Sequence, residues 1–247
     1  MKKSHIVLLL LSLLFAGCTK IFSSVFENYS GNGVITSEVR PSDKFQSIKL
    51  EGAYDVTITQ GPTSEVRIET DKNLLPHITT SVSNGKLTVS SEGNLQPTKN
   101  INVFITSPNY HSIEVEGSSD VRSTSTISSD ELSLLLEGSG SFALGVEAKT
   151  LKSDIEGSGT ITLTGSAQDH SMEIDGSGDL YNDSLVVNTA KINISGSGDA
   201  ALNVLSRLDA SINGSGGVRY RGPVTNVHTS ISGSGSVDRA SDTSAMH

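Results

Sequence analysis

The tripeptide Gly-Ser-Gly, or a variant with one residue changed, recurs seven times in the second half of the chain at steps of 18–21 residues. The first glycines of these motifs are Gly117, Gly138, Gly157, Gly176, Gly196, Gly214 and Gly233. A repeat of this length is too short for a pair of helices, and it fits one coil of a β-solenoid, where each coil packs on its neighbours. The repeat therefore restricts the fold much more than it restricts the activity.

Apolar residues flank every motif at alternate positions. The residue two places before the first glycine is apolar in all seven repeats, from Val115 to Ile231, and the residue four places after it is apolar from Val121 to Val237. The positions between them are mostly polar, and this period of two is typical of strands with one buried face. Each coil is therefore predicted to have one strand before a glycine corner and another strand after it.

The two glycines of each motif predict a tight corner, because glycine accepts a positive φ and has no Cβ to clash where coils pack. The seven first glycines are therefore predicted to be structural residues. Stacked at about 4.8 Å, the interstrand spacing, the hydroxyls of the central serines are expected to form a hydrogen-bonded ladder. These serines are Ser118, Ser139, Ser158, Ser177, Ser197, Ser215 and Ser234.

An earlier segment around Gly52 matches the same template, with apolar residues at the same relative positions. These residues are Ile48, Leu50, Val56 and Ile58. The distance from Gly52 to Gly117 is 65 residues, which leaves room for about three more coils with longer turns. Strands are expected between the prolines of this stretch, at residues 66–69, 78–82, 86–90 and 101–106.

The predicted fold class is therefore all-β, a single-stranded right-handed parallel β-helix with coils of about 18–21 residues. The β-helix is predicted to run continuously over residues 31–237, irregular in its first half and regular in its second. Residues 238–247 are predicted to be a polar C-terminal tail.

Residues 1–17 have the pattern of an export signal. Lys2 and Lys3 precede a short apolar core, which is too short for a permanent membrane span, and a small pair of residues stands before Cys18, the only cysteine. The segment resembles a bacterial lipoprotein signal, although Phe15 stands where leucine is usual. An ordinary secretory signal followed by a chance cysteine is the alternative.

Cleavage before Cys18 would make this residue the lipid-attachment site. A diacylglycerol thioether with a further acyl chain such as palmitate on the amine anchors a protein stably, whereas one chain does not. Lipidation would also consume a lone thiol, which is a liability in an oxidising compartment. We therefore predict a lipidated tether at residues 18–30 and contact with the outer membrane through the anchor, with the periplasmic or surface face left open.

The charge of the chain excludes some functions. Removal of residues 1–17 leaves 16 Lys and Arg against 27 Asp and Glu, a net charge of −11. An acidic chain without basic clusters argues against nucleic acid as a partner. The histidines lack metal-ligand spacing, and the short coils leave little chain for the walls of an active-site cleft, so we expect no cofactor and no enzyme.

Acidic residues gather one place before the corner glycines. They are Glu116, Glu137, Glu156 and Asp175, with Glu114, Asp154 and Glu173 two places further back on the same outward face. Like charges on neighbouring strands repel one another unless water, salt or a cation screens them. This stripe is either a weak site for a divalent cation such as Ca²⁺ or a basic partner, or a solvated face that deters edge aggregation.

Several ordered motifs together resemble a known family. They are Phe45-Gln-Ser-Ile-Lys-Leu-Glu-Gly-Ala-Tyr-Asp-Val56, Asn84-Gly-Lys-Leu-Thr-Val89, Ile101-Asn-Val-Phe-Ile-Thr-Ser-Pro108 and the Gly-Ser-Gly-Asp series. Over residues 40–237 the chain is similar to the putative auto-transporter adhesin, head GIN domain family of bacterial envelope proteins. The resemblance implies a right-handed β-helix and an envelope location, and it brings no catalytic residues.

We therefore expect a non-catalytic lipoprotein of the outer membrane that serves as a binding or structural module. The expected ligand is an envelope glycan or protein, and the resemblance does not say which one is bound. The alternative is a β-helix that binds or cleaves a polysaccharide. A cleft with convergent carboxylates would distinguish this alternative from the first interpretation.

Overall fold

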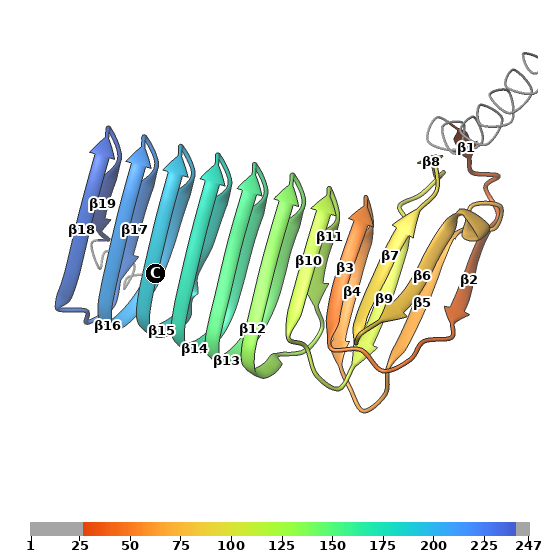
Figure 1. Cartoon of the computed structure of the whole chain (residues 1–247), viewed down its shortest axis with the longest axis horizontal. Helices are drawn as coiled ribbons and strands as arrows, with labels where there is room; N and C mark the ends of the chain where they lie inside the picture. The colour runs from red at the N-terminus through yellow and green to blue at the C-terminus, as the bar shows by residue number, and fades with distance from the viewer. Residues whose placement is uncertain (1–26, 241–247) are drawn as a thin grey trace, which may run out of the picture.

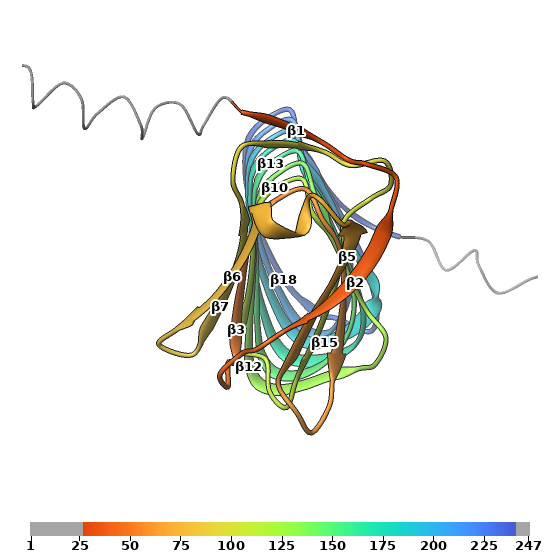
Figure 2. The same cartoon turned by 90° about the vertical axis from the view of Figure 1, so that its right-hand side faces the viewer.

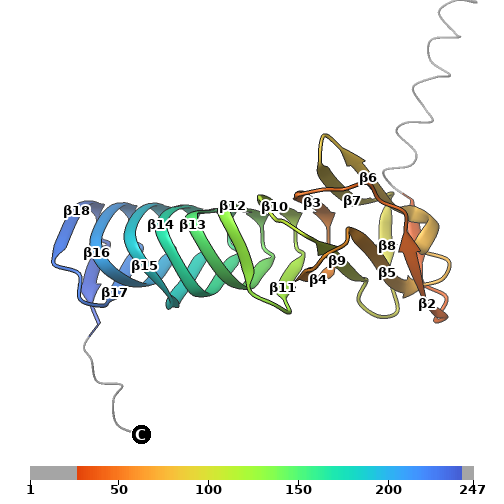
Figure 3. The same cartoon turned by 90° about the horizontal axis from the view of Figure 1, so that it is seen from below.

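The computed structural model describes residues 27–240, which form a rod of stacked β-coils (Figure 1). Parallel strands stack from coil to coil along the second half of the rod, in register except for shifts after Thr162, Asn182 and Val187. The predicted fold class, an all-β parallel β-helix with short coils, is confirmed. Seen from below, the strands lie on two sides of the rod and belong to one continuous hydrogen-bonded network (Figure 3). We call the side with β3 (Ser47–Gly52), β10 (Ser112–Gly117) and β12 (Ile127–Gly138) the first sheet, and the side with β4 (Asp55–Gln60), β11 (Asp120–Ser123) and β17 (Gly217–Arg221) the second sheet.

Each coil of the regular half crosses from one sheet to the other, often within one long bent strand. The strands are β10 (Ser112–Gly117), β11 (Asp120–Ser123), β12 (Ile127–Gly138), β13 (Ser141–Gly157), β14 (Thr160–Gly176), β15 (Asp179–Gly196), β16 (Asp199–Gly214), β17 (Gly217–Arg221), β18 (Asn226–Gly233) and β19 (Ser236–Arg239). Apolar residues on the inward positions of these strands are buried. One such column runs through Val115, Leu136, Ile155, Ile174, Ile194 and Ile212. Ile231 ends it, with 44% of its surface exposed on the last coil.

The corners require glycine for a steric reason. The seven first glycines have φ between 120° and 142°, a region that residues with a Cβ rarely adopt. A Cβ at any of them would lie 2.1–2.7 Å from the carbonyl oxygen of the equivalent glycine in the preceding coil. Successive corners therefore pack backbone against backbone, and no larger residue fits without moving a coil.

The expected ladder of serine hydroxyls is wrong, because the backbone makes the ladder instead. The amide N–H of each central serine donates to the carbonyl oxygen of the first glycine one coil earlier, at 2.8–3.1 Å. The seven serine side chains are exposed, and in the described part of the chain their hydroxyls make no hydrogen bond. The corner is thus held by hydrogen bonds between backbone amide and carbonyl groups, and the serine side chain faces water there.

The first half departs from a continuous solenoid. β3 (Ser47–Gly52) and β4 (Asp55–Gln60) form the coil that matches the template, and β10 pairs directly with β3, so that Gly117 lies beside Gly52. No coil separates them, and the prediction of about three intervening coils in one continuous helix is wrong. Residues 61–111, between β4 and β10, instead cover the other side of the β3–β4 coil.

Those residues form strands at all four predicted places. They are β5 (Glu65–Asp71), β6 (Ile78–Ser83), β7 (Lys86–Ser91) and β9 (Asn102–Ser107). β7 pairs in parallel with β3 and β9 with β4, whereas β6 and β5 are antiparallel to β7 and β9. The two-residue turn Asn84-Gly85, with both φ angles positive, reverses the chain as a type I′ hairpin, which a one-way solenoid cannot contain.

A cap closes this end of the rod (Figure 2). β2 (Ile35–Arg40) adds an antiparallel strand to β5, β1 (Asn28–Ser30) pairs with β8 (Asn94–Gln96), and Leu74 and Leu75 are buried at the 3₁₀ turn Leu75–His77. The buried carboxylate of Asp71 ties the cap together, because it accepts hydrogen bonds from the amides of Gly33 (2.6 Å) and Thr98 (2.8 Å). Burial alone would raise the pKa of Asp71, but these hydrogen bonds outweigh it and hold the pKa below its usual value.

The predicted signal segment 1–17, the lipid-attachment residue Cys18 and most of the tether lie outside the described residues. Within residues 27–240 the model has no helix with the length and apolar character that a bilayer crossing requires.

The corner geometry makes a prediction for two adjacent residues. In Gly196→Ala the new Cβ would meet the Gly176 oxygen at 2.1 Å, so we expect a loss of about 2–5 kcal/mol in unfolding free energy. Ser197→Ala is the matched control and should stay within about 0.5 kcal/mol of wild type, because this exposed hydroxyl makes no hydrogen bond in the described chain. Urea unfolding curves measure both values. Equal losses in the two variants would contradict the steric account of the corner.

Candidate functional site

The four predicted stripe residues lie side by side on the outer face of the first sheet. Glu116, Glu137, Glu156 and Asp175 occupy in-register positions of β10, β12, β13 and β14. Glu51 on β3 extends this row by one strand. We call the acidic face the set Glu51, Glu114, Glu116, Glu137, Asp154, Glu156, Glu173 and Asp175, because all eight point outward from neighbouring strands.

A lysine that the sequence analysis missed neutralises one end of the acidic face. The Lys49 ammonium lies 2.5 Å from Glu116, 3.2 Å from Glu51 and 3.3 Å from Glu114, and Lys86 lies 2.8 Å from Glu114. The hydrogen bond to Glu116, with those to the other two carboxylates, raises the pKa of Lys49. Burial acts to raise the pKa of Glu114, but the two lysines outweigh it and lower that pKa.

The position of Lys49 relative to the corner glycine indicates where its side chain lies in the coil. Lys49 stands three places before Gly52, the same offset at which Glu114 precedes Gly117. Because three coils were expected between these glycines, the two side chains were not expected to be neighbours. The direct pairing of β3 with β10 brings them together.

Toward the other end of the acidic face, fewer lysines neutralise the negative charges of the carboxylates. Partial burial raises the pKa of Glu137, and the negative charges of Glu116 and Glu156 on the adjacent strands raise it further. No cation lies within ion-pair distance of Glu137 in the described chain, and Lys152 pairs with Asp154 instead. Repulsion between stacked carboxylates is therefore evident at Glu137, which lies between Glu116 and Glu156.

The acidic face does not form a metal cage. Across residues 27–240, no group of three or more His, Cys, Asp or Glu side chains converges closely enough to hold a metal ion. The carboxylates follow the strands as a row, whereas Ca²⁺ takes six to eight oxygen ligands around one point. The geometry thus favours a solvated face or a basic partner over the calcium site that the sequence left open.

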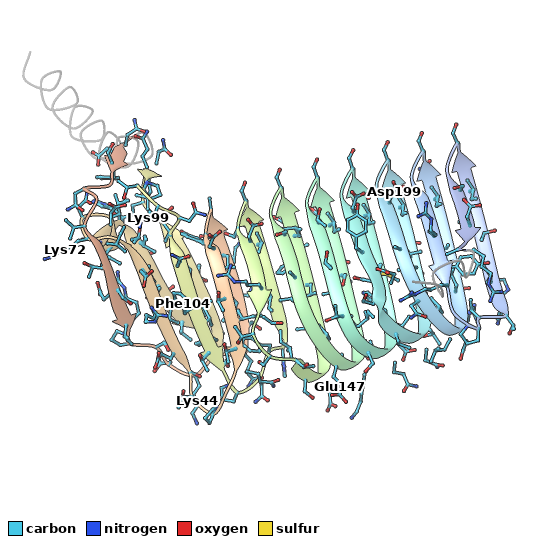
Figure 4. The ribbon with its side chains drawn as sticks, turned by 180° about the vertical axis from the view of Figure 1, so that it is seen from behind. Lys44, Lys72, Lys99, Phe104, Glu147 and Asp199 are labelled. Atoms are coloured by element: carbon cyan, nitrogen blue, oxygen red, sulfur yellow. The ribbon has the colours of Figure 1, made fainter. Side chains whose placement is uncertain are left out.

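A second row of carboxylates lies after the corners, on the face shown in Figure 4, where Asp199 is labelled. The Asp179 carboxylate accepts a hydrogen bond from the Asp199 amide (3.1 Å), and the Asp199 carboxylate accepts one from the Gly217 amide (2.8 Å). Ser141 donates to Asp120 at 2.5 Å in the same row. These aspartates therefore join successive coils through side-chain to backbone or side-chain to side-chain bonds.

The histidines do not assemble into a site. His170 is buried in the solenoid interior, where its Nε2 lies 2.9 Å from the Ser153 hydroxyl, and burial lowers its pKa to about 3. A neutral imidazole in this position acts as a core residue. His77 stacks on the ring of Tyr29 at the capped end, with 3.6 Å between ring centroids.

A walled notch of about 520 Å³ lies where the corner motif is absent. In the first coil, Gly52-Ala53-Tyr54 replaces Gly-Ser-Gly, and the chain between β7 and β9 rises beside it as a wall. We call this place the notch, and its polar lining includes Asp55, Asp120, Asn94 and Asn100. The Asn100 amide donates to one oxygen of Asp55 at 2.8 Å, so the other oxygen remains as an acceptor.

The electrostatics of the acidic face predict opposite effects for its two ends. The triple substitution Glu137→Gln, Glu156→Gln and Asp175→Asn relieves repulsion and should raise the melting temperature in low salt by up to about 4 °C, the shift expected from about 1 kcal/mol. Lys49→Met should lower the melting temperature, because Glu51 and Glu116 lose their cation and Glu114 keeps only Lys86.

Both shifts should shrink in 0.5 M NaCl as salt screens the charges. Calorimetry at two salt concentrations, with and without millimolar calcium, measures them. A large fall in melting temperature for the triple variant without calcium would contradict the repulsion, and a calcium-dependent rise in wild type alone would restore the cation site.

Solved structures with this architecture come from species of Bacteroides and Parabacteroides. One, named a putative adhesin from Bacteroides fragilis NCTC 9343, aligns with a TM-score of 0.83 at 22% identity, covering 86% of this chain and 100% of that chain. Another, a putative adhesin from Parabacteroides distasonis ATCC 8503, aligns with a TM-score of 0.72 at 26% identity over 87% of this chain and 100% of that chain.

A third structure from Parabacteroides distasonis ATCC 8503 carries the name putative lipid binding protein, with a TM-score of 0.74, 21% identity and coverage of 87% of this chain and 100% of that chain. Among curated proteins, none matches the chain. The family model "Putative auto-transporter adhesin, head GIN domain" matches residues 44–223, which include the β3–β4 coil, the capping hairpin and most of the regular coils. The resemblance expected from the ordered motifs is thereby confirmed, and the chain belongs to the putative auto-transporter adhesin, head GIN domain family.

Proposed function

We propose that the chain is a lipid-anchored, non-catalytic binding module of the bacterial outer membrane, an adhesin-type β-helix. Membership of the head GIN domain family supports the adhesin type and an envelope or surface location. The relative of 26% identity that is named a putative adhesin supports the same function. The acidic face also fits a non-catalytic role, because its carboxylates are aligned in a row and partly neutralised by lysines.

The notch is the observation that carries the binding function. Ligand sites usually occupy about 300–1,000 Å³, and the volume of the notch falls within this range. Its lining combines carboxylate and amide acceptors with the apolar side chains of Leu95 and Ile101. Such a lining suits a polar ligand with several hydroxyl donors and a small apolar surface, such as a segment of an envelope glycan.

The anchor would hold the capped end of the rod close to the membrane. β1 begins at Asn28, so the segment from Cys18 to Asn28 spans at most about 35 Å. The cap, the notch and the part of the acidic face near Lys49 lie at the capped end of the rod, whereas β18 and β19 would project away from the bilayer (Figure 1). Two or three acyl chains on Cys18 supply enough apolar area for stable attachment.

Cys18→Ser tests the anchor. The variant should move from the membrane pellet to the soluble periplasmic or culture fraction, because the short apolar segment before residue 18 is too short to span a bilayer. Cell fractionation with blotting measures the shift, and metabolic labelling with a palmitate analogue should mark wild type alone. A variant that stays in the membrane after signal cleavage would refute the lipoprotein.

Substitutions in the notch test the binding function. Asp55→Asn with Asp120→Asn keeps the shape and removes two acceptor charges, and it should weaken retention on isolated envelope polysaccharide by about tenfold, the effect of about 1.4 kcal/mol. Asp175→Asn on the acidic face is the matched control and should bind like wild type. A glycan array and a pull-down from envelope extracts would identify the ligand.

A polysaccharide-active β-helix is the second candidate, and the notch favours it as well, since a polymer end would fit the same acceptors. Incubation of the protein with the polysaccharide recovered in the pull-down distinguishes binding from cleavage. An increase in reducing ends during incubation would show cleavage, whereas retention without new reducing ends would show binding. Unchanged retention in the double notch variant would refute the notch as the binding place.

A further inference from the structure

A second hollow, of about 250 Å³, lies on the outer face of the second sheet near the last coils. Tyr181 on β15 and Arg219 on β17 form its two walls, and Ala201 on β16 lies between them as the floor. Asp199 and Asp238 stand at its rim. We call this place the Tyr181 hollow, and it is distinct from the notch because the two share no lining residue.

The hollow exists because two small residues interrupt rows of larger side chains. Ala201 occupies the position between Tyr181 and Arg219 in one row, and Gly217 follows Asp199 in the neighbouring row. A Cβ on Gly217 would come within 2.9 Å of the Asp199 carboxylate. Because Gly217 has no Cβ, the Asp199 carboxylate can lie over it, beside the uncovered Ala201.

The orientation of Tyr181 exposes one face of its ring to this space. Its hydroxyl donates to Asp179, two residues earlier on the same strand, at 3.1 Å. The ring therefore lies along the strand, and its faces turn toward the neighbouring strands, with Ala201 on one side and Thr162 on the other. Tyr181 is 46% exposed, whereas Tyr54 and Tyr110 are buried in the core.

The polar side chains around the Tyr181 ring have donors and acceptors that make no hydrogen bond within residues 27–240. The exposed guanidinium of Arg219 has no hydrogen bond or ion pair to any group of residues 27–240, although Asp199 and Asp238 stand at the same rim. One oxygen of Asp199 accepts from the Gly217 amide and one oxygen of Asp238 accepts from the Ser236 hydroxyl at 2.7 Å. Each carboxylate therefore keeps a second oxygen for a donor outside the chain.

We propose that the Tyr181 hollow binds one pyranose ring of a neutral glycan. Tyr181 and Arg219 are two strands apart, about 9.6 Å between backbones, which leaves room for one ring once the two walls are subtracted. The apolar C–H face of the sugar packs on the tyrosine, as apolar groups do on exposed aromatic rings. Its hydroxyls accept from the Arg219 guanidinium and donate to Asp199 and Asp238.

The chemistry of the hollow selects against two other ligand classes. The carboxylates at the rim repel anionic sugars, and the single arginine provides too little positive charge to offset them in a chain of net charge −9. A cationic ligand would meet the Arg219 guanidinium at close range. The inference rests on the proposed binding function and adds a ligand class and a second place where a glycan chain is held.

The test uses the full chain purified from membranes in a polyoxyethylene ether detergent, since sugar-based detergents would compete. The probes are cellobiose, maltose, lactose and mannobiose, followed by saturation-transfer NMR and by tyrosine fluorescence, which is readable because the chain has no tryptophan. At least one disaccharide should receive saturation on ring protons. Tyr181→Ala and Ala201→Leu, which fills the hollow without removing the ring, should each weaken that binding at least tenfold.

Thr162→Leu is the matched control, because it places the same leucine side chain on the other side of Tyr181, outside the hollow. It should bind like wild type, and circular dichroism should show the same strand content in all variants. The proposal is overturned if no probe receives saturation from the wild-type protein, or if Ala201→Leu binds like wild type. Binding that survives Tyr181→Ala but is lost in the Asp55→Asn and Asp120→Asn variant also overturns it and leaves the notch as the binding place.

Discussion

The contact between glycine backbones at successive corners is the constraint on which the rest of the structure depends. Each corner carbonyl occupies the place where the next glycine would have a Cβ, so the coils approach as closely as the hydrogen-bonded strands require. A larger residue at one corner would open the spacing on one side of the rod and tilt every coil above it. The apolar columns inside and the polar rows outside stay in register because the corners do.

Near the corners, where the register is kept, the outer surface consists of rows of equivalent positions, and the charges within each row act on one another. A residue type that recurs at one place in the repeat becomes a line of identical side chains about 4.8 Å apart. For the row that begins at Glu51 this means repulsion, which Lys49 relieves at one end and which still raises the pKa of Glu137 further along the row. For the row of Asp179 and Asp199 the carboxylates accept backbone amides of the next coil and become part of the ladder.

The repeat predicted the strands and corners, which depend on local sequence pattern. It did not predict which coils stack on one another. The apolar columns, the corners and the four strands of the first half follow from alternation, glycine and proline, which act within a few residues. The Asn84-Gly85 turn also contained a local hairpin signal, yet its consequence, that β10 stacks on β3 across 65 residues, is a tertiary choice. Lys49, the notch and the Tyr181 hollow depend on that choice or on neighbours three strands away, and no short window of sequence contains them.

The uniform coils from β12 to β16 have an evolutionary consequence. The chain enters and leaves each of these coils at equivalent points, so duplication or loss of a gene segment for one coil would lengthen or shorten the rod by one strand spacing without disturbing the rest. The β3–β4 coil lacks this freedom, because later segments lie on both of its sides. We expect relatives to vary in coil number on the side away from the cap, while the capped end keeps one fixed arrangement.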